Sequence, residues 1–309
     1  MLITLIAGLV SLQASSTEIV LLAEPAPLHG TLLNPEGDAR ATAVILPGSG
    51  PTDRDGDSPM GITAGTYRLL AEGLAVEGIA TVRIDKRGIA GSAAAGAVEA
   101  DLRFGAYVAD ARAWAGEAAA RTGQSCAWLI GHSEGALVAL AAADDSKVCG
   151  LVLLSGAGRP AGAVLREQLA AVPEPLKSKA FAALGELEQG RTVADAPPEL
   201  AALFRPSVQP YLISWLALDP AALIAAYDGP VLIGHGTTDI QVGIADAEAL
   251  AAAQPRARLA RFDGVNHVLK VAPVDRAANL ATYRDRAQPL APGVVEAVAG
   301  FIREHTSGQ

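Results

Sequence analysis

Short runs of apolar residues alternate with amphipathic stretches along most of the chain. A continuous apolar run, which is expected of a strand buried on both faces of a sheet, covers residues 42–46, and further mainly apolar runs that read as strands cover residues 79–84, 128–131, 148–154 and 231–234. The stretches that read as helices between or after these runs are residues 67–75, 107–114, 245–253 and 294–303. This alternation predicts an α/β fold with a mostly parallel twisted sheet flanked by helices.

The sheet is expected to begin with antiparallel strands. Residues 18–23 and 28–33 read as a strand pair joined by Glu24-Pro25-Ala26-Pro27, because the two apolar stretches are separated by turn-forming residues. Residues 258–262 predict a late strand, which follows the helix at 245–253.

The regular alternation stops between residues 155 and 228. Helical pieces at 161–171 and 176–189 are punctuated by prolines, and no strand pattern occurs there. An insertion of this length is long enough to form a helical cap over the strand ends. The predicted organisation is therefore a core of residues 15–154 and 229–309, with the cap at residues 155–228.

The first 14 residues form an apolar run that ends in small residues, with Ala14 as the expected cleavage position. This pattern is typical of a signal peptide and is short for a span of a bilayer. A basic n-region is missing, so a buried first strand is the alternative reading. We predict export to the periplasm or the medium, and a cytoplasmic protein if this segment is not a signal.

Composition indicates an acidic globular protein. Hydrophobic residues make up 50% of the 309 residues and charged residues 18%, with a net charge of −9 and a pI near 5.1. These values exclude a disordered chain and argue against nucleic acid or an anionic membrane surface as a partner. Every later apolar run is broken by charge, Gly or Pro, so no stable membrane span is predicted.

The two cysteines, Cys126 and Cys149, lie near the starts of consecutive predicted strands. They do not have the spacing of a metal site, and neither sits in a catalytic motif. In an exported protein the neighbouring strand starts would permit a disulfide, and two buried free thiols are the alternative.

The sequence Gly131-His132-Ser133-Glu134-Gly135 follows an apolar run and precedes a stretch suited to a helix. G-x-S-x-G between a strand and a helix is the pattern of a nucleophile elbow. Both glycines are needed because a Cβ at either position would collide with the neighbouring strand or helix. The elbow lifts the Ser133 hydroxyl out of the sheet, at the N-terminus of the new helix.

Two partners follow in the chain: Asp239 after the apolar run at 231–234, and His267 after the strand at 258–262. Ser, Asp, His is the order in α/β hydrolases. The chain resembles that superfamily over nearly its whole length, and most closely its bacterial serine carboxylesterase branch. The motifs that carry the resemblance are PGSGPTDRDG at 47–56, DKRG at 85–88, GHSEG at 131–135, GTTDIQV at 236–242 and NHVLK at 266–270.

Two positions depart from the pattern of the branch. Ala90 replaces the second glycine of the usual R-G-x-G-x-S, and Pro47 stands where many relatives have His. Both changes concern the shape of a loop and leave the three candidate catalytic residues intact.

The resemblance implies an α/β-hydrolase fold and a Ser-His-Asp triad. Ser133 is the expected nucleophile, His267 takes its proton, and Asp239 fixes the tautomer of the imidazole. The backbone N–H groups of Ser49 and Glu134 are the expected oxyanion hole, because Ser49 lies in the Gly-rich loop after a strand upstream of the elbow. No metal ion or organic cofactor is required.

The predicted function is hydrolysis of a small-molecule carboxylic ester with a short or medium acyl group, of the type classed as EC 3.1.1. A thioesterase, peptidase or acyltransferase could use the same three residues. A non-catalytic binding protein on this fold is the third alternative, and the complete Ser133, Asp239 and His267 set argues against it. The oligomeric state stays open.

Other polar residues are expected to have structural roles. His132 should pack inward beside the nucleophile, and His235 should be structural. The loop residues 53–55 are expected to brace the loop rather than form a wall of the pocket, and the Glu134 side chain to brace nearby loops. Asp246 and Glu248 are expected on a solvated face of the helix at 245–253.

Overall fold

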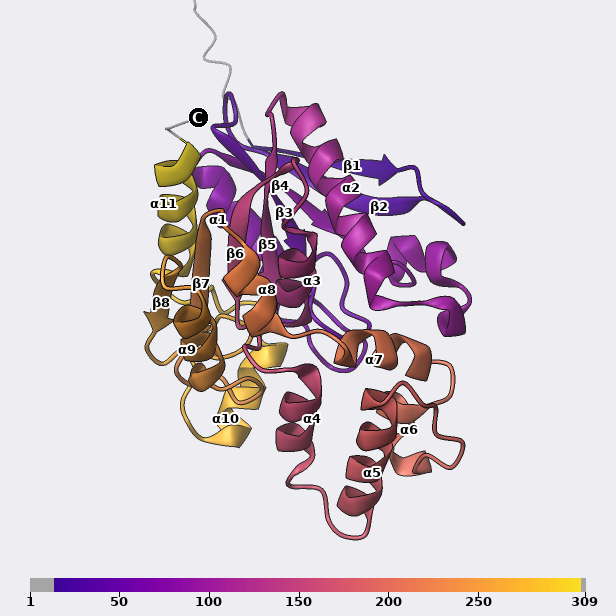
Figure 1. Cartoon of the computed structure of the whole chain (residues 1–309). Coiled ribbons are helices and arrows are strands. Elements are labelled where there is room, and N and C mark those ends of the chain that lie inside the picture. The colour runs from indigo at the N-terminus through magenta and orange to yellow at the C-terminus, as the bar shows by residue number, and fades with distance from the viewer. Residues whose placement is uncertain (1–13, 307–309) are drawn as a thin grey trace, which may run out of the picture.

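The computed structural model describes residues 14–306, in which eight strands form one sheet with helices on both faces (Figure 1). The strand order is β1-β2-β4-β3-β5-β6-β7-β8. β1 pairs with β2 and β2 with β4 in antiparallel fashion, and all remaining pairs are parallel. The strands are β1 (Ser15–Leu21), β2 (Leu28–Asn34), β3 (Ala41–Leu46), β4 (Ile79–Ile84), β5 (Ala127–His132), β6 (Val148–Leu154), β7 (Val231–Gly236) and β8 (Arg258–Phe262). The predicted fold class is thus confirmed, including its antiparallel start.

Two layers of helices cover the sheet. α1 and α11 pack on one face, and α2, α3, α8 and α9 belong to the hydrophobic cluster on the other. The helices are α1 (Thr66–Val76), α2 (Phe104–Thr122), α3 (Glu134–Ala142), α4 (Ala161–Leu169), α5 (Leu176–Glu188), α6 (Ala201–Phe204), α7 (Gln209–Leu216), α8 (Pro220–Ala226), α9 (Ile244–Ala253), α10 (Arg276–Ala281) and α11 (Val294–Thr306). Short 3-10 helices cover Ala90–Gly96, Glu99–Asp101, Pro198–Leu200 and Thr282–Arg284.

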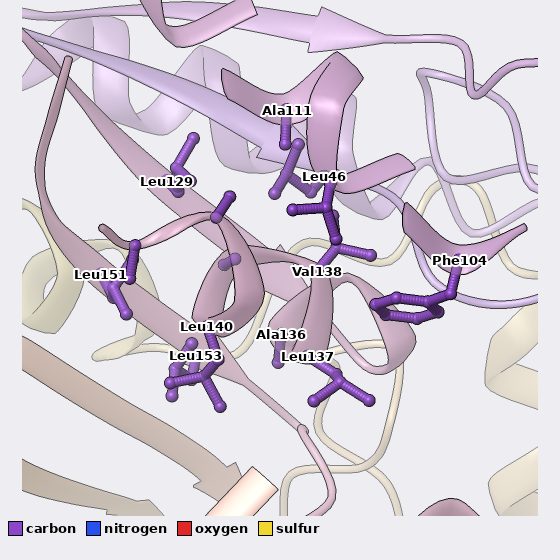
Figure 2. Close-up of a cluster of buried hydrophobic side chains, with 14 of the residues drawn as sticks. Leu46, Phe104, Ala111, Leu129, Ala136, Leu137, Val138, Leu140, Leu151 and Leu153 are labelled. Carbon is purple, nitrogen blue, oxygen red and sulfur yellow. The ribbon is translucent and has the colours of Figure 1, made fainter. Parts of the chain in front are cut away.

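The central strands are buried on both faces, which explains their mainly apolar sequences. Every residue of β3, β4, β5 and β7 is buried. Figure 2 shows the cluster between the sheet and α3, where Leu129 of β5 and Leu151 and Leu153 of β6 lie around the side chains of α3. This packing fixes the position of α3, and with it the position of the residue that precedes α3.

α2 is longer than the sequence pattern predicts. It runs from Phe104 to Thr122 instead of 107–114. Its last turns are rich in alanine, and Ala115, Ala118 and Ala119 are buried against the sheet cluster although they carry little apolar area. The helix ends at Gly123, which adopts the left-handed conformation with φ 71°.

Helices alone connect β6 to β7. Residues 155–230, all of which the structure describes, contain α4, α5, α6, α7 and α8 and no strand. In Figure 1, α4, α5 and α6 lie beyond the end of the sheet from which β6 leads into α4.

The entry to this helical segment is anchored by Asp246 of α9, for which the sequence-based prediction is wrong. Asp246 is fully buried. Its carboxylate accepts hydrogen bonds from the N–H of Gly158 at 3.0 Å, from the N–H of Arg159 at 3.1 Å and from the Arg159 guanidinium. The pattern along the helix could not reveal this, because the residues that cover Asp246 come from a distant loop. Glu248 is exposed and pairs with Arg261, as expected.

The predicted signal peptide, residues 1–14, lies outside the described residues except for Ala14. Export therefore stays a prediction. Between residues 14 and 306, no helix combines the length and apolar character needed to cross a bilayer.

Cys126 and Cys149 form a disulfide that joins the segment before β5 to the second residue of β6. Their Cα atoms are 5.3 Å apart, and their sequence separation is 23. Of the two readings of the cysteines, the disulfide is the one the structure supports.

We expect replacement of both cysteines by serine to lower the free energy of unfolding by about 3 kcal/mol, because the crosslink restricts the unfolded chain over a loop of this size. Urea denaturation of the wild type and of the double variant, with and without reductant, measures the difference. The reductant should destabilise the wild type alone, and equal stability of oxidised wild type and variant would contradict the prediction.

Candidate active site

Ser133 sits between β5 and α3 in a strained backbone conformation. Its φ is 55° and its ψ is −119°, outside the regions that non-glycine residues usually occupy. The N–H of Ser133 donates to the carbonyl of Leu154 at 2.9 Å, which holds the turn against β6. Strain of this kind persists only where the surroundings enforce it, and here it presents the side chain at the N-terminus of α3.

The two glycines of the elbow allow backbone segments to approach closely, as predicted. A Cβ on Gly131 would lie 2.1 Å from the carbonyl oxygen of Gly135. A Cβ on Gly135 would lie 2.3 Å from the carbonyl oxygen of Leu46, at the end of β3. α3 therefore packs directly on the backbone of β3 and β5, which no larger residue at either position permits.

Asp239 and His267 are brought together by the loops after β7 and β8. Nδ1 of His267 lies 2.7 Å from Oδ2 of Asp239. Because a carboxylate only accepts, Nδ1 is the donor in this contact, and in the neutral imidazole Nε2 then has a free lone pair. His267 and Ser133 line the same cavity, while the Asp239 side chain is fully buried behind the histidine.

The environment of Asp239 favours the ionised carboxylate. Burial by itself would raise the pKa of Asp239, but the adjacent His267 and the hydrogen bonds outweigh it and hold the pKa below its ordinary value. Oδ1 accepts from the N–H of Gln241 at 2.8 Å and from the N–H of Val242 at 3.0 Å. An anion fixed in this way can orient His267 and stabilise its protonated form.

His132 packs inward, as expected, and connects the backbone of His267 to the loop after β3. Its Nε2 lies 2.7 Å from the His267 carbonyl, so Nε2 carries the proton. Burial, followed by the nearby His267, lowers the pKa of His132 to about 3, so the ring is neutral and Nδ1 accepts. The Tyr67 hydroxyl donates to this Nδ1 at 2.8 Å and accepts from the N–H of Gly48 at 2.9 Å.

The role of Tyr67 was missed from the sequence, where it reads as one more residue on the buried face of an amphipathic helix. The ring of Tyr67 is buried and its hydroxyl is its only polar group. The signal that could have found it is the tyrosine hydroxyl itself, since a buried tyrosine usually has a hydrogen-bond partner.

The two candidate oxyanion donors lie on the cavity. Ser49 and Glu134 both line it, and the ideal Cβ of Gly48 lies 3.2 Å from the Ser133 Cβ. Glu134 begins α3, so its N–H is among the first of the helix, which have no partner within the helix. The Glu134 side chain is buried and its Oε1 lies 3.6 Å from Nζ of Lys86.

The cavity beside Ser133 has a volume of about 1220 Å³, above the range of about 300–1,000 Å³ common for small-molecule sites. Its wall comes from the segments that follow β3, β4, β7 and β8, from the elbow, and from the helical segment between β6 and β7. Apolar residues that line it include Met60, Ile62, Ile89, Leu102, Leu137, Val164, Leu165, Leu169, Leu203, Val208, Leu212, Trp215, Val242, Val268 and Leu280.

The loop residues 53–55 brace the loop, as expected, and none of them lines the cavity. Arg54 binds Asp85 through its backbone N–H at 2.9 Å and its guanidinium at 2.7 Å. The Asp53 side chain accepts from the N–H groups of Asp55 and Asp57. Asp55 pairs with Arg83 of β4.

His235 has a structural contact, with Nε2 lying 2.9 Å from the carbonyl of Val242. This bond ties β7 to the loop that carries Asp239. Across residues 14–306, no group of three or more His, Cys, Asp or Glu side chains is arranged to hold a metal ion.

Ala90, one of the two departures from the motif pattern, adopts a φ of 44°. Glycine adopts this left-handed conformation without strain. This explains why the usual motif has glycine at this position.

Comparisons with known proteins agree with this architecture. The profile of the family described as serine aminopeptidase, S33, matches residues 60–262. Esterase EstD from Thermotoga maritima is 27% identical over 250 residues, which are 78% of this chain and 58% of that protein. The chain thus spans somewhat more than half the length of this curated relative.

Solved structures with the same fold include Est1E from Butyrivibrio proteoclasticus, with a TM-score of 0.59 at 18% identity over 94% of this chain and 99% of that chain. The esterase Pf2001 from Pyrococcus furiosus has a TM-score of 0.55 at 16% identity, over 95% of this chain and 93% of that chain. At these identities the likeness concerns the fold.

We expect His132 to make the protein sensitive to acid. With a pKa of about 3 when folded and about 6.5 when unfolded, the ring takes up a proton on unfolding between these values. The contribution of the neutral ring to the free energy of unfolding is complete above pH 6.5 and is lost as the pH falls toward 3. Between pH 6.5 and pH 4 the free energy of unfolding should fall by about 3 kcal/mol.

Urea denaturation of the wild type and of His132→Gln between pH 4 and 7 measures this effect. The variant should lack this part of the pH dependence, whatever its absolute stability. Parallel stability curves for the two proteins would contradict the assignment of a neutral, buried His132.

Proposed function

Because the chain belongs to the serine aminopeptidase S33 family of α/β hydrolases, we propose that it hydrolyses carboxylic esters with short to medium acyl groups through an acyl-enzyme on Ser133. The observation that carries the proposal is the combination of a strained Ser133 and the His267–Asp239 pair at one cavity. The name of the matched relative, esterase EstD, supports it further.

In the proposed reaction, Nε2 of His267 takes the hydroxyl proton while Oγ of Ser133 attacks the ester carbonyl carbon. The N–H groups of Ser49 and Glu134 stabilise the oxyanion that forms. His267 then gives the proton to the leaving alcohol, and the acyl group stays on Oγ. Water attacks the acyl-enzyme by the same route and releases the acid. Asp239 keeps Nδ1 protonated throughout, since their 2.7 Å contact fixes the tautomer.

The helical segment 155–228 is proposed to act as the cap that supplies the apolar part of the substrate pocket. Val164 and Leu165 of α4 and Leu212 and Trp215 of α7 line the cavity. Their apolar surfaces suit an acyl chain or an apolar alcohol, which would leave water on binding.

The carboxylates of the cavity argue against a peptide substrate with a free N-terminus. Two carboxylates line the cavity among the described residues, Glu99 and Glu134. Glu99 is bound by Arg205 at 2.8 Å, and Glu134 is paired with Lys86 at 3.6 Å. A substrate ammonium group needs an unpaired carboxylate, because burying it without one is costly. We therefore favour esterase activity over the aminopeptidase activity in the description of the family.

Export is proposed for the same chain. The apolar segment of residues 1–14 supports it, as does the Cys126–Cys149 disulfide, because such bonds persist mainly in oxidising compartments.

We expect p-nitrophenyl esters from acetate to long acyl chains to be hydrolysed, with the highest kcat/KM at short or medium length. Ser133→Ala should lower kcat by about 10³-fold or more, and Asp239→Asn by about 10²–10⁴-fold, because the amide no longer holds the correct tautomer. Aminoacyl p-nitroanilides should be cleaved far more slowly than esters.

Asp228→Asn is the matched control for Asp239→Asn, because Asp228 is exposed and, within residues 14–306, forms an ion pair with the exposed Arg256 alone. Its activity should equal that of the wild type. Wild-type activity in Ser133→Ala would refute the nucleophile assignment, and faster cleavage of aminoacyl anilides than of esters would favour a peptidase.

A further inference from the structure

Gly48, in the loop after β3, has both of its backbone polar groups bound by buried side chains. Its N–H donates to the Tyr67 hydroxyl at 2.9 Å, and its carbonyl accepts from Nζ of Lys86 at 2.5 Å. Tyr67 is bonded to His132, and Lys86 is paired with Glu134. His132 and Glu134 are the neighbours of Ser133 in the sequence. Each of them therefore connects the elbow to Gly48 through one side chain, Tyr67 at the N–H and Lys86 at the carbonyl.

We propose that Lys86 is a positioning residue for the oxyanion hole, which aims and polarises the N–H of Ser49 by binding the carbonyl of Gly48. The proposal rests on the proposed function, because the oxyanion hole is part of that reaction. Lys86 follows β4 and lies within the D-K-R-G motif, which has no chemical role in the proposed ester hydrolysis.

The planar peptide bond couples the carbonyl of Gly48 to the N–H of Ser49. The carbonyl of Gly48 and the N–H of Ser49 belong to one peptide unit, and in a trans peptide they point in opposite directions. A donor that fixes the carbonyl therefore fixes the N–H. Among the described residues the Ser49 N–H has no acceptor, and Ser49 lies on the cavity. This N–H is free to bind a substrate oxyanion.

Lys86 and Glu134 form a buried pair. The Lys86 side chain is 7% exposed and that of Glu134 3%. Burial lowers the pKa of Lys86, whereas the charge of Glu134 acts in the opposite direction. A cationic donor on a carbonyl withdraws electron density from its peptide group, so the N–H of that group becomes a stronger donor, and the effect is larger where water is excluded.

The test compares Lys86→Met with the double variant Lys86→Met/Glu134→Gln. Methionine keeps an unbranched apolar chain and removes the ammonium group. The single variant leaves Glu134 buried without its partner and can fail to fold. The double variant removes both charges and keeps the backbone N–H of residue 134. Lys147→Met is the matched control. Lys147 also donates to a backbone carbonyl, that of Ser125 at 3.3 Å, but it lies near the ends of β5 and β6 that are opposite to the cavity.

In the double variant we expect kcat for a p-nitrophenyl ester to fall on the order of 10- to 100-fold. This loss is smaller than the loss expected when an oxyanion-hole donor is removed completely. KM should stay within about threefold, because the bond between Ser49 and substrate strengthens only in the transition state. A trifluoromethyl ketone, which forms a tetrahedral adduct with a serine, should bind more weakly by the factor by which kcat/KM falls. Lys147→Met should change none of these values.

A second readout does not depend on turnover. Gly-Ser occurs twice in the sequence, at Gly48-Ser49 and at Gly91-Ser92. Carbonyl-¹³C glycine with ¹⁵N serine therefore gives two amide–carbonyl NMR correlations. The Ser92 N–H donates to the Ile89 carbonyl, so this pair serves as an internal reference. In the double variant the Gly48-Ser49 signal should move and the Gly91-Ser92 signal should stay.

The two claims can fail separately. A folded wild type that hydrolyses no ester contradicts the proposed function, and the NMR signals then decide the role of Lys86. An unmoved Gly48-Ser49 signal overturns the proposal. So does a double variant that keeps its kcat within twofold, or one that loses activity through KM with unchanged affinity for the trifluoromethyl ketone.

Discussion

The close approach of α3 to the backbone of β3 and β5 is the constraint on which the site depends. It requires glycine at 131 and 135, since a Cβ at either position would overlap a carbonyl group. The apolar cluster of Figure 2 packs α3 against the sheet. Ser133, which lies between β5 and α3, has to adopt a backbone conformation that permits this packing. Ser133 is therefore strained by the core.

The same packing explains why buried polar side chains surround the nucleophile. His132 and Glu134 are carried into the interior by the elbow, where their polar groups need partners. They obtain them from Tyr67 of α1 and Lys86 after β4, and these partners in turn bind the backbone of Gly48. One network thus satisfies the buried groups and joins the loop after β3 to the elbow. The packing that fixes Ser133 and the loop after β3 thus also gives them the arrangement that the proposed reaction needs.

Local patterns predicted much of this. The apolar runs predicted the buried strands. G-x-S-x-G predicted the elbow, because its glycines allow α3 to approach the backbone of β3 and β5. Asp239 and His267 stood out because each follows a predicted strand. Tyr67 and Lys86 could not be assigned roles, since their partners lie 65 and 38 residues away in the chain. Asp246 was misplaced for the same reason: the backbone of Gly158 and Arg159, distant in sequence, covers it.

The most direct test of the central claim is covalent labelling with a fluorophosphonate, followed by peptide mass spectrometry. The reagent reacts with a serine whose hydroxyl is activated by a base and whose surroundings stabilise a tetrahedral anion. We expect one adduct per chain, on the peptide that contains Ser133, and none after His267→Ala. A folded protein that is not labelled, or an adduct on another serine, would contradict it.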